Sequence, residues 1–217
     1  MTRAGLLLLG LVSLVVSGFS RTKSDVASIN LAAASATYRV DSSKSRATIH
    51  VGKAGAFSFL AGHSHDISGP IQSGSIDVDP EEPTRARVQL IIAAADLKVA
   101  AEREPEGDAP KVQEAMESEK VLDVAHHPRI TYESRAVTLK DRQGQTLNLN
   151  VIGHLTIRDV MQEVTAPVRV ELGAAELSAT GRFSIKQSAF GIKPISIGGV
   201  VAVKDALDLE FTIVARK

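Results

Sequence analysis

The sequence predicts an all-β domain, a barrel or a sandwich, on three observations. Apolar and polar residues alternate along Leu147–Ile157, which is the pattern of a strand with one dry face. The same alternation returns in 168–172, 177–185 and 207–213. Only residues 97–127 depart from it. Consecutive two-faced strands favour an antiparallel sheet closed around an apolar interior.

The N-terminal half supplies the remaining strands. Glycines and an Asp-Pro pair end them, and short polar turns such as 141–144 favour hairpin connections between them. In chain order, extended segments are expected at Tyr38–Asp41, Ala47–Val51, Gly74–Val78, Val88–Ile92 and Ile130–Thr138.

Residues 97–127 predict one short helix. Two prolines and a glycine interrupt any strand in the first half of this insert, and Val112 and Met116 then recur at helical spacing. We expect Asp108 to cap the helix and Pro110 to lie in its first turn, where a missing amide costs little. The insert would lie across an open barrel end as a lid.

The composition excludes several classes of protein. With 217 residues, 44% apolar and 23% charged, the chain is expected to form one domain, or at most two small ones, with a sizeable core. Zero net charge and 4% aromatic residues without Trp argue against nucleic-acid binding. The lack of Cys excludes disulfides, thiolate metal sites and thiol nucleophiles.

The N-terminus has the pattern of a secretory signal. Arg3 precedes an apolar run from Ala4 to Val16, which small residues follow. The run is shorter than the ~20 residues of a membrane span, so we expect a signal peptide over 1–18, with an uncleaved N-terminal anchor as the alternative. Residues 19–36 then form a linker and 37–217 the folded domain. We therefore expect the protein to be exported to the periplasm or outside the cell.

No catalytic constellation stands out. A G-x-S-x-G nucleophile motif is absent from the sequence, and the glutamates crowded between 102 and 119 fit a solvated helix face. The chain is therefore expected not to be an enzyme.

A histidine cluster indicates a possible metal site, which would give the protein a different function. In His63-Ser64-His65-Asp66 the two imidazoles share one face of an extended segment, so they could bind one metal ion, with His50 or His154 as a third ligand. A metal-dependent enzyme or metal-binding protein is then the alternative function. The simpler interpretation is that this stretch is a polar loop whose histidine side chains form hydrogen bonds with backbone groups.

The dry strand faces leave two possibilities for the interior. They either line a cavity for an apolar ligand, which needs no charged partner, or pack against each other as a filled core. A filled core would make the chain a structural envelope protein. Periodicity alone does not separate the two.

Several segments, taken in order, resemble the YceI-like family of bacterial secreted lipid-binding domains. The resemblance extends from about Tyr38 to Lys217. It rests on Tyr38–Asp41, Gly74–Val78, Ala93–Leu97, Val121–Val124, His127–Tyr132, Gly153–Ile157 and Phe190–Ile192.

The resemblance implies an eight-stranded antiparallel, lipocalin-like barrel with a short helical insert at one end. Such a barrel would carry a polyisoprenoid, an isoprenoid quinone or a fatty acyl chain without any cofactor, exchange it at a membrane surface, and form a homodimer. Val112 and Met116 would gate the mouth. The expected lining residues are Val51, Phe57, Phe59, Leu90, Ile92, Leu155, Ile157, Phe183, Ile185 and Phe190.

Two positions depart from the family pattern. Gln187 and Ala189 stand where the family often carries Arg and Asp, and Arg158-Asp159 stands where Gly commonly follows the Leu-Thr-Ile strand. A polar contact at the lip and a turn are expected to differ. Gly62-His63-Ser64-His65 matches a stretch of some members and adds interest to a polar or metal function.

Overall fold

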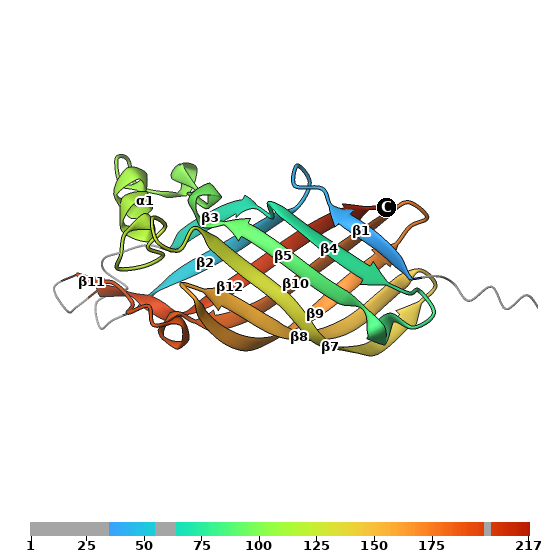
Figure 1. The fold of residues 1–217 in the computed structure, drawn as a ribbon. Coiled ribbons are helices and arrows are strands. Elements are labelled where there is room, and N and C mark those ends of the chain that lie inside the picture. Colours follow the sequence, from blue (N-terminus) through green and yellow to red (C-terminus); the bar gives the residue numbers. More distant parts are fainter. Residues whose placement is uncertain (1–34, 55–63, 198–200) are drawn as a thin grey trace, which may run out of the picture. The chain divides into compact units, whose positions relative to one another are not determined.

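The computed structural model describes residues 35–54, 64–197 and 201–217 (Figure 1). The predicted signal peptide and all but the last residues of the predicted linker lie outside these ranges, as do Phe57, Phe59 and His63. The first strand, β1, begins at Ala36, one residue before the predicted start of the domain.

Strands make up most of the described chain. In order they are β1 (Ala36–Val40), β2 (Arg46–Ala54), β3 (His65–Pro70), β4 (Ser73–Val78), β5 (Arg87–Ala93), β6 (Lys98–Val99), β7 (Arg129–Gln143), β8 (Thr146–Ile157), β9 (Val160–Leu172), β10 (Glu176–Lys186), β11 (Ser196–Ile197) and β12 (Val201–Arg216). The helices are α1 (Ala109–Glu117) and the 3-10 turns η1 (Pro83–Arg85), η2 (Ala94–Asp96), η3 (Ala101–Arg103) and η4 (Gln187–Phe190).

The sheet closes into a barrel with eight wall positions. Strands β7, β8, β9, β10 and β12 follow one another as antiparallel neighbours, and β12 then pairs with both β1 and β2. Strand β4 pairs with β1 and β5, while β3 pairs with β2 and β6. The pairs β1/β2, β3/β4 and β5/β6 therefore each act as one interrupted strand. The predicted eight-stranded antiparallel barrel is confirmed, with α1 at one end (Figure 1).

The break between β1 and β2 is bridged by one buried side chain. Ser45, which is 2% exposed, donates its hydroxyl to the carbonyl oxygen of Val214 on β12 (3.1 Å) and accepts the amide of the same residue (3.0 Å). The side chain thus replaces the ladder hydrogen bonds that the turn at 41–45 interrupts.

Ser45→Ala is expected to lower the free energy of unfolding by about 2 kcal/mol, because it leaves the half-buried amide of Val214 without a partner, while the Val214 carbonyl still accepts from the Asp41 amide at 2.8 Å. Urea unfolding would show a lower midpoint with an unchanged slope. The exposed Ser42→Ala in the same turn is the control and should change stability by less than ~0.5 kcal/mol. Equal midpoints for the two variants would contradict the bridging role.

Strand β8 confirms the predicted dry face. Its burial alternates residue by residue, with Leu147, Leu149, Val151, Leu155 and Ile157 buried and the residues of the other face, most of them polar, partly exposed. Inward residues of the other strands join them in two apolar clusters, one toward the β7–β8 turn and one beneath the helical insert.

Helix α1 lies within the predicted insert, and Pro110 is in its first turn as expected. Asp108 holds the N-cap position but makes no capping hydrogen bond, because its backbone is already helical (φ −91°, ψ −31°). Its carboxylate instead accepts from Lys111 Nζ at 3.0 Å. None of the helices in the described ranges has the length and apolar character needed to cross a bilayer.

A candidate ligand cavity

The barrel interior holds a cavity of about 240 Å³. One water occupies ~10–15 Å³ on a comparable measure, so the cavity is far larger than a packing defect. Side chains from strands on every side of the barrel line it, and the insert contributes Met116, Val121 and Leu122. The lining is almost entirely apolar. A filled core does not describe this interior.

Nine of the expected residues lie on the cavity wall. These are Val51, Leu90, Ile92, Met116, Leu155, Ile157, Phe183, Ile185 and Phe190. Phe57 and Phe59 lie outside the described residues.

Val112 is half-buried and is not one of the residues that line the cavity. Gln113, its neighbour on α1, accepts the Val99 amide (2.9 Å) and donates to the Leu97 carbonyl (2.9 Å). This turn of the helix is thereby fixed against the β6 segment, and only Met116, toward the helix end, reaches the cavity.

Two wall residues come from a stretch of the sequence without a periodic pattern. Val121 and Leu122 follow α1 in an irregular turn and line the cavity beside Met116. The signals for them were an apolar pair in an otherwise polar insert and the resemblance of Val121–Val124 to the family. The wall also includes Leu147, Leu149 and Val151, whose alternation already placed them on the dry face.

The mouth is the barrel end that the insert covers. On one side of it, polar side chains hold the insert against β2 and β3. His50 Nδ1 donates to Asp66 Oδ1 at 2.7 Å, and Arg103 on η3 donates to the other oxygen of Asp66. His65 Nδ1 donates to Glu104 Oε1 at 2.9 Å. The carboxylates therefore bind histidines and an arginine, and these contacts join the insert to the barrel wall.

The described ranges contain no group of three or more His, Asp or Glu side chains placed to hold a metal ion. His63 lies outside them. His154 lies on the outer face of β8, between Glu133 and Glu163 on the neighbouring strands, and β8 pairs with neither β2 nor β3, the strands of His50 and His65.

On the other side of the mouth, the β8–β9 turn holds the exit of the insert. Arg158 and Asp159 both have left-handed backbone angles (φ 51° and 59°), which cost free energy for residues other than Gly. Arg158 donates to the Val121 carbonyl at 3.2 Å, and Asp159 accepts from His127 at 2.9 Å. This departure from the family pattern therefore provides two contacts to the lid.

Gln187, the other departure, is buried in the cavity wall. Its amide donates to the Lys204 carbonyl on β12 at 2.7 Å. Ala189 presents only its backbone carbonyl, which accepts from Gln162 at 2.8 Å. At these two positions the contacts are therefore neutral, where the family pattern often has an Arg and an Asp.

Tyr132 on β7 provides a phenol in the wall. Burial raises the pKa of Tyr132 to about 12. Gly153 leaves room for the ring, because a Cβ at that position would lie 2.5 Å from both Cζ and Oη of Tyr132.

The raised pKa predicts alkaline sensitivity. Above its ordinary value of 10.0 the phenol ionises first in the unfolded chain, so stability is lost as the pH rises from 10 toward about 12. Tyr132→Phe is expected to lose less stability across this interval. Urea midpoints of both proteins at about pH 9 and about pH 11 test this, since other titrating groups cancel in the comparison. Parallel losses in the two proteins would contradict it.

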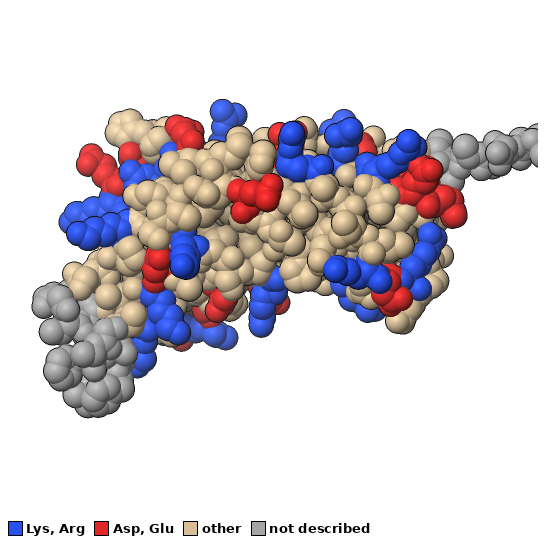
Figure 2. Space-filling model, turned by 90° about the horizontal axis from the view of Figure 1, so that it is seen from below, with Lys and Arg blue, Asp and Glu red and all other residues tan. Residues whose placement is uncertain are grey.

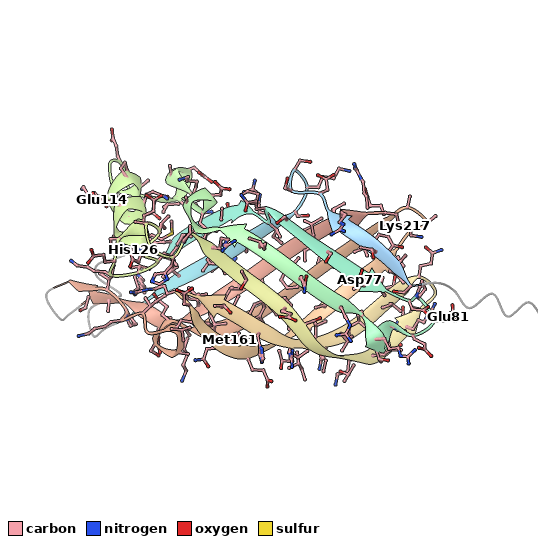
Figure 3. All side chains as sticks on the ribbon, viewed as in Figure 1. Asp77, Glu81, Glu114, His126, Met161 and Lys217 are labelled. Atoms are coloured by element: carbon pink, nitrogen blue, oxygen red, sulfur yellow. The ribbon has the colours of Figure 1, made fainter. Side chains whose placement is uncertain are left out.

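The outer surface differs sharply from the interior. Lys and Arg are interspersed with Asp and Glu on the face shown in Figure 2, without a large patch of one sign. Glu114 and His126 project at the end that carries α1, while Glu81 and Lys217 lie toward the opposite end (Figure 3). A face with such mixed charge offers no broad attraction for nucleic acid.

Comparison with solved structures gives the same fold. BcnA of Burkholderia cenocepacia is 24% identical with a TM-score of 0.59, covering 81% of this chain and 99% of its own. A polyisoprenoid binding domain from Saccharophagus degradans is 13% identical with a TM-score of 0.61, covering 82% of this chain and 97% of its own. No curated protein matches.

The sequence also matches a family model along most of the barrel. The matched residues are 38–215, which run from within β1 almost to the end of β12. Together with the closed eight-position barrel, this match shows that the chain belongs to the family of the YceI-like domain.

Proposed function

We propose that the protein is a non-enzymatic carrier that holds a long apolar chain inside its barrel. The observation that carries this proposal is the cavity itself, which is enclosed by apolar side chains from the whole circumference of the barrel and from the insert. A polyisoprenoid, an isoprenoid quinone or a fatty acyl chain has the matching chemistry.

The energetics favour a chain over a compact polar molecule. Each methylene moved from water into such a cavity contributes ~0.8 kcal/mol, so about ten give roughly 8 kcal/mol before the cost of immobilisation is subtracted. A charged group would lose its hydration without gaining a partner, because Glu210, the only charged residue along the wall among those the structure describes, is bound to Arg182. The head group of an ionised lipid would therefore remain at the mouth.

The family and the fold support the same class of ligand. The barrel from Saccharophagus degradans, described as binding polyisoprenoid, has the same architecture. In the proposed cycle the apolar ligand enters at the mouth beneath Met116, Val121 and Leu122, and the protein exchanges this ligand at a membrane surface. The N-terminal signal would deliver the protein to the periplasm or outside the cell.

The test is to purify the untagged protein gently from its native host and analyse an organic extract by mass spectrometry. We expect a stoichiometric long-chain lipid, and we expect delipidated protein to take up a labelled isoprenoid. Elemental analysis of the same sample tests the metal alternative of His63 and His65. The carrier proposal fails if the protein yields no lipid and takes up no isoprenoid.

A further inference from the structure

A second cavity, of about 400 Å³, lies on the outer side of the barrel wall. Its lining comes from η1, the beginning of β5 and the middle of β7. Strand β5 begins at the end of the barrel away from α1 (Figure 1). Whereas the ligand cavity is lined almost entirely by apolar side chains, this outer cavity is lined by three exposed arginines, Arg85, Arg87 and Arg135. The two cavities therefore suit different ligands.

The outer cavity forms because β5 and β7 separate. Their ladder ends at the pair of Gln89 and Glu133. Ser134, the next residue of β7, accepts the Val88 amide with its Oγ at 2.8 Å, so a side chain replaces the next backbone hydrogen bond. The beginning of β5 and η1 then leave β7, and the cavity lies between them.

A β-bulge in β7 turns one arginine toward this cavity. Ser134 and Ala136 pair with Gly153 and Ile152, which are consecutive residues of β8, so Arg135 is an extra residue without a ladder partner. A bulge of this kind changes the direction of the side chain that it inserts. Arg135 therefore lines the cavity from the β7 side.

The positive charge of the outer cavity is only partly compensated. Asp79 is the one carboxylate among the lining residues that the structure describes, and Arg85 donates to Glu82 of its own turn. Within the described ranges, neither Arg87 nor Arg135 forms an ion pair or a side-chain hydrogen bond. Two guanidinium groups are therefore left to bind an anion.

The neighbouring polar side chains favour the same kind of ligand. Asp77 is the ladder neighbour of Arg87 on β4, but its carboxylate accepts from the Thr37 hydroxyl at 2.5 Å. Ser134 accepts a backbone amide and so keeps its hydroxyl proton to donate, and Thr84 adds a second hydroxyl to the lining. The cavity therefore offers hydroxyl donors beside its guanidinium groups.

We propose that the outer cavity binds a phosphate group. A guanidinium presents a planar fork of N–H donors that matches phosphate oxygens, and an anion among three arginines offsets their mutual repulsion. A carboxylate has only two oxygens and would leave some of these donors unused. The site does not depend on the carrier function, because none of its arginines lines the ligand cavity. A soluble phosphate and a phospholipid head group share this chemistry, and the experiment separates them.

The test titrates the purified protein with inorganic phosphate at low salt, by calorimetry and by nuclear magnetic resonance of the arginine Nε–Hε groups. The first variant is the pair Arg87→Gln and Arg135→Gln. Its control is the pair Arg129→Gln and Arg169→Gln, which changes the net charge equally at exposed positions outside both cavities. A second variant, Ala136→Glu, keeps all three arginines and adds a carboxylate at an exposed position of the lining.

We expect the Arg87 and Arg135 pair of substitutions to weaken phosphate binding at least ~10-fold, and Ala136→Glu to do the same. The control pair should stay within about twofold of the wild type, because exposed charges away from the site are screened. In the wild type, phosphate should shift two Nε–Hε signals that the first variant lacks. Thermal midpoints establish that each variant is folded. Acetate should bind the wild type more weakly than phosphate.

Co-sedimentation with vesicles of phosphatidylcholine, with and without phosphatidic acid, identifies the source of the phosphate. Binding that requires both phosphatidic acid and the two arginines assigns the site to a lipid head group, whereas binding of inorganic phosphate alone assigns it to a soluble phosphate. The proposal is overturned if the folded wild type binds neither probe, if acetate binds as tightly as phosphate, or if the control pair loses as much affinity as the Arg87 and Arg135 pair. Neither probe enters the barrel, so these results leave the carrier function untouched.

Discussion

Ala166→Phe is expected to weaken binding of a long-chain ligand at least ~10-fold, which corresponds to about 1.4 kcal/mol, while the barrel stays folded. Ala166 lies on β9, is 4% exposed, and faces the cavity beside Val151 of β8. A phenyl ring at this position occupies space that the chain would fill. Cavity-filling substitutions of this kind often raise stability, so the thermal midpoint should not fall.

The adjacent Thr165→Phe is the matched control, because Thr165 is exposed on the outer face of the same strand. It adds the same ring outside the barrel and should leave affinity for a labelled isoprenoid unchanged. Titration of both delipidated variants gives the comparison. Wild-type affinity in a folded Ala166→Phe protein would show that the chain does not occupy this part of the cavity.

Leu147→Ala is expected to lower the free energy of unfolding by about 3 kcal/mol, within the range that Leu-to-Ala substitutions cover in buried cores. Leu147 is 0% exposed at the start of β8 and lies between Arg142 on β7 and Val170 on β9 in the ladder. Truncation removes apolar contacts and enlarges a space that already exists, which the surrounding wall cannot close.

Urea unfolding of the delipidated protein measures this loss. Asn150→Ala on the same strand serves as the control, since Asn150 is on the outer face between Thr138 and Pro167 and should change stability by less than ~0.5 kcal/mol. The prediction is wrong if the two variants unfold at the same midpoint.

Local pattern predicted the orientation of the strands because orientation is a local property. In β8 the side-chain period of two places Leu149 inside and Asn150 outside whatever the neighbouring strands do. The number of wall positions is not local. It depends on β12 pairing with both β1 and β2, which lie far away in sequence, and eight strands followed only from the family resemblance.

The alternation of apolar and polar residues could not distinguish a cavity from a filled core, for a related reason. Alternation shows which side chains face inward, but it does not show how completely opposite walls fill the space between them. Small inward residues such as Ala166 and Ala179 leave room that becomes visible only when the walls are assembled.

Polar residues at the mouth were harder still to predict. His65 finds its carboxylate on Glu104, 39 residues away, so the His-x-His spacing alone could not tell a metal ligand from a salt bridge to the insert. The unpaired hydroxyl of Tyr132 is likewise a property of the assembled barrel, because it depends on the absence of a partner on β5 and β8.

The contacts of the β8–β9 turn hold the insert without taking part in the sheet of the barrel. Arg158 and Asp159 hold the exit of the insert through side chains, and no strand pairing of the barrel depends on those two bonds. Releasing them would remove one contact each from Val121 and His127 while β8 and β9 keep their backbone ladder. The contacts that hold this end of the insert are thereby separate from the hydrogen bonds that keep the barrel closed.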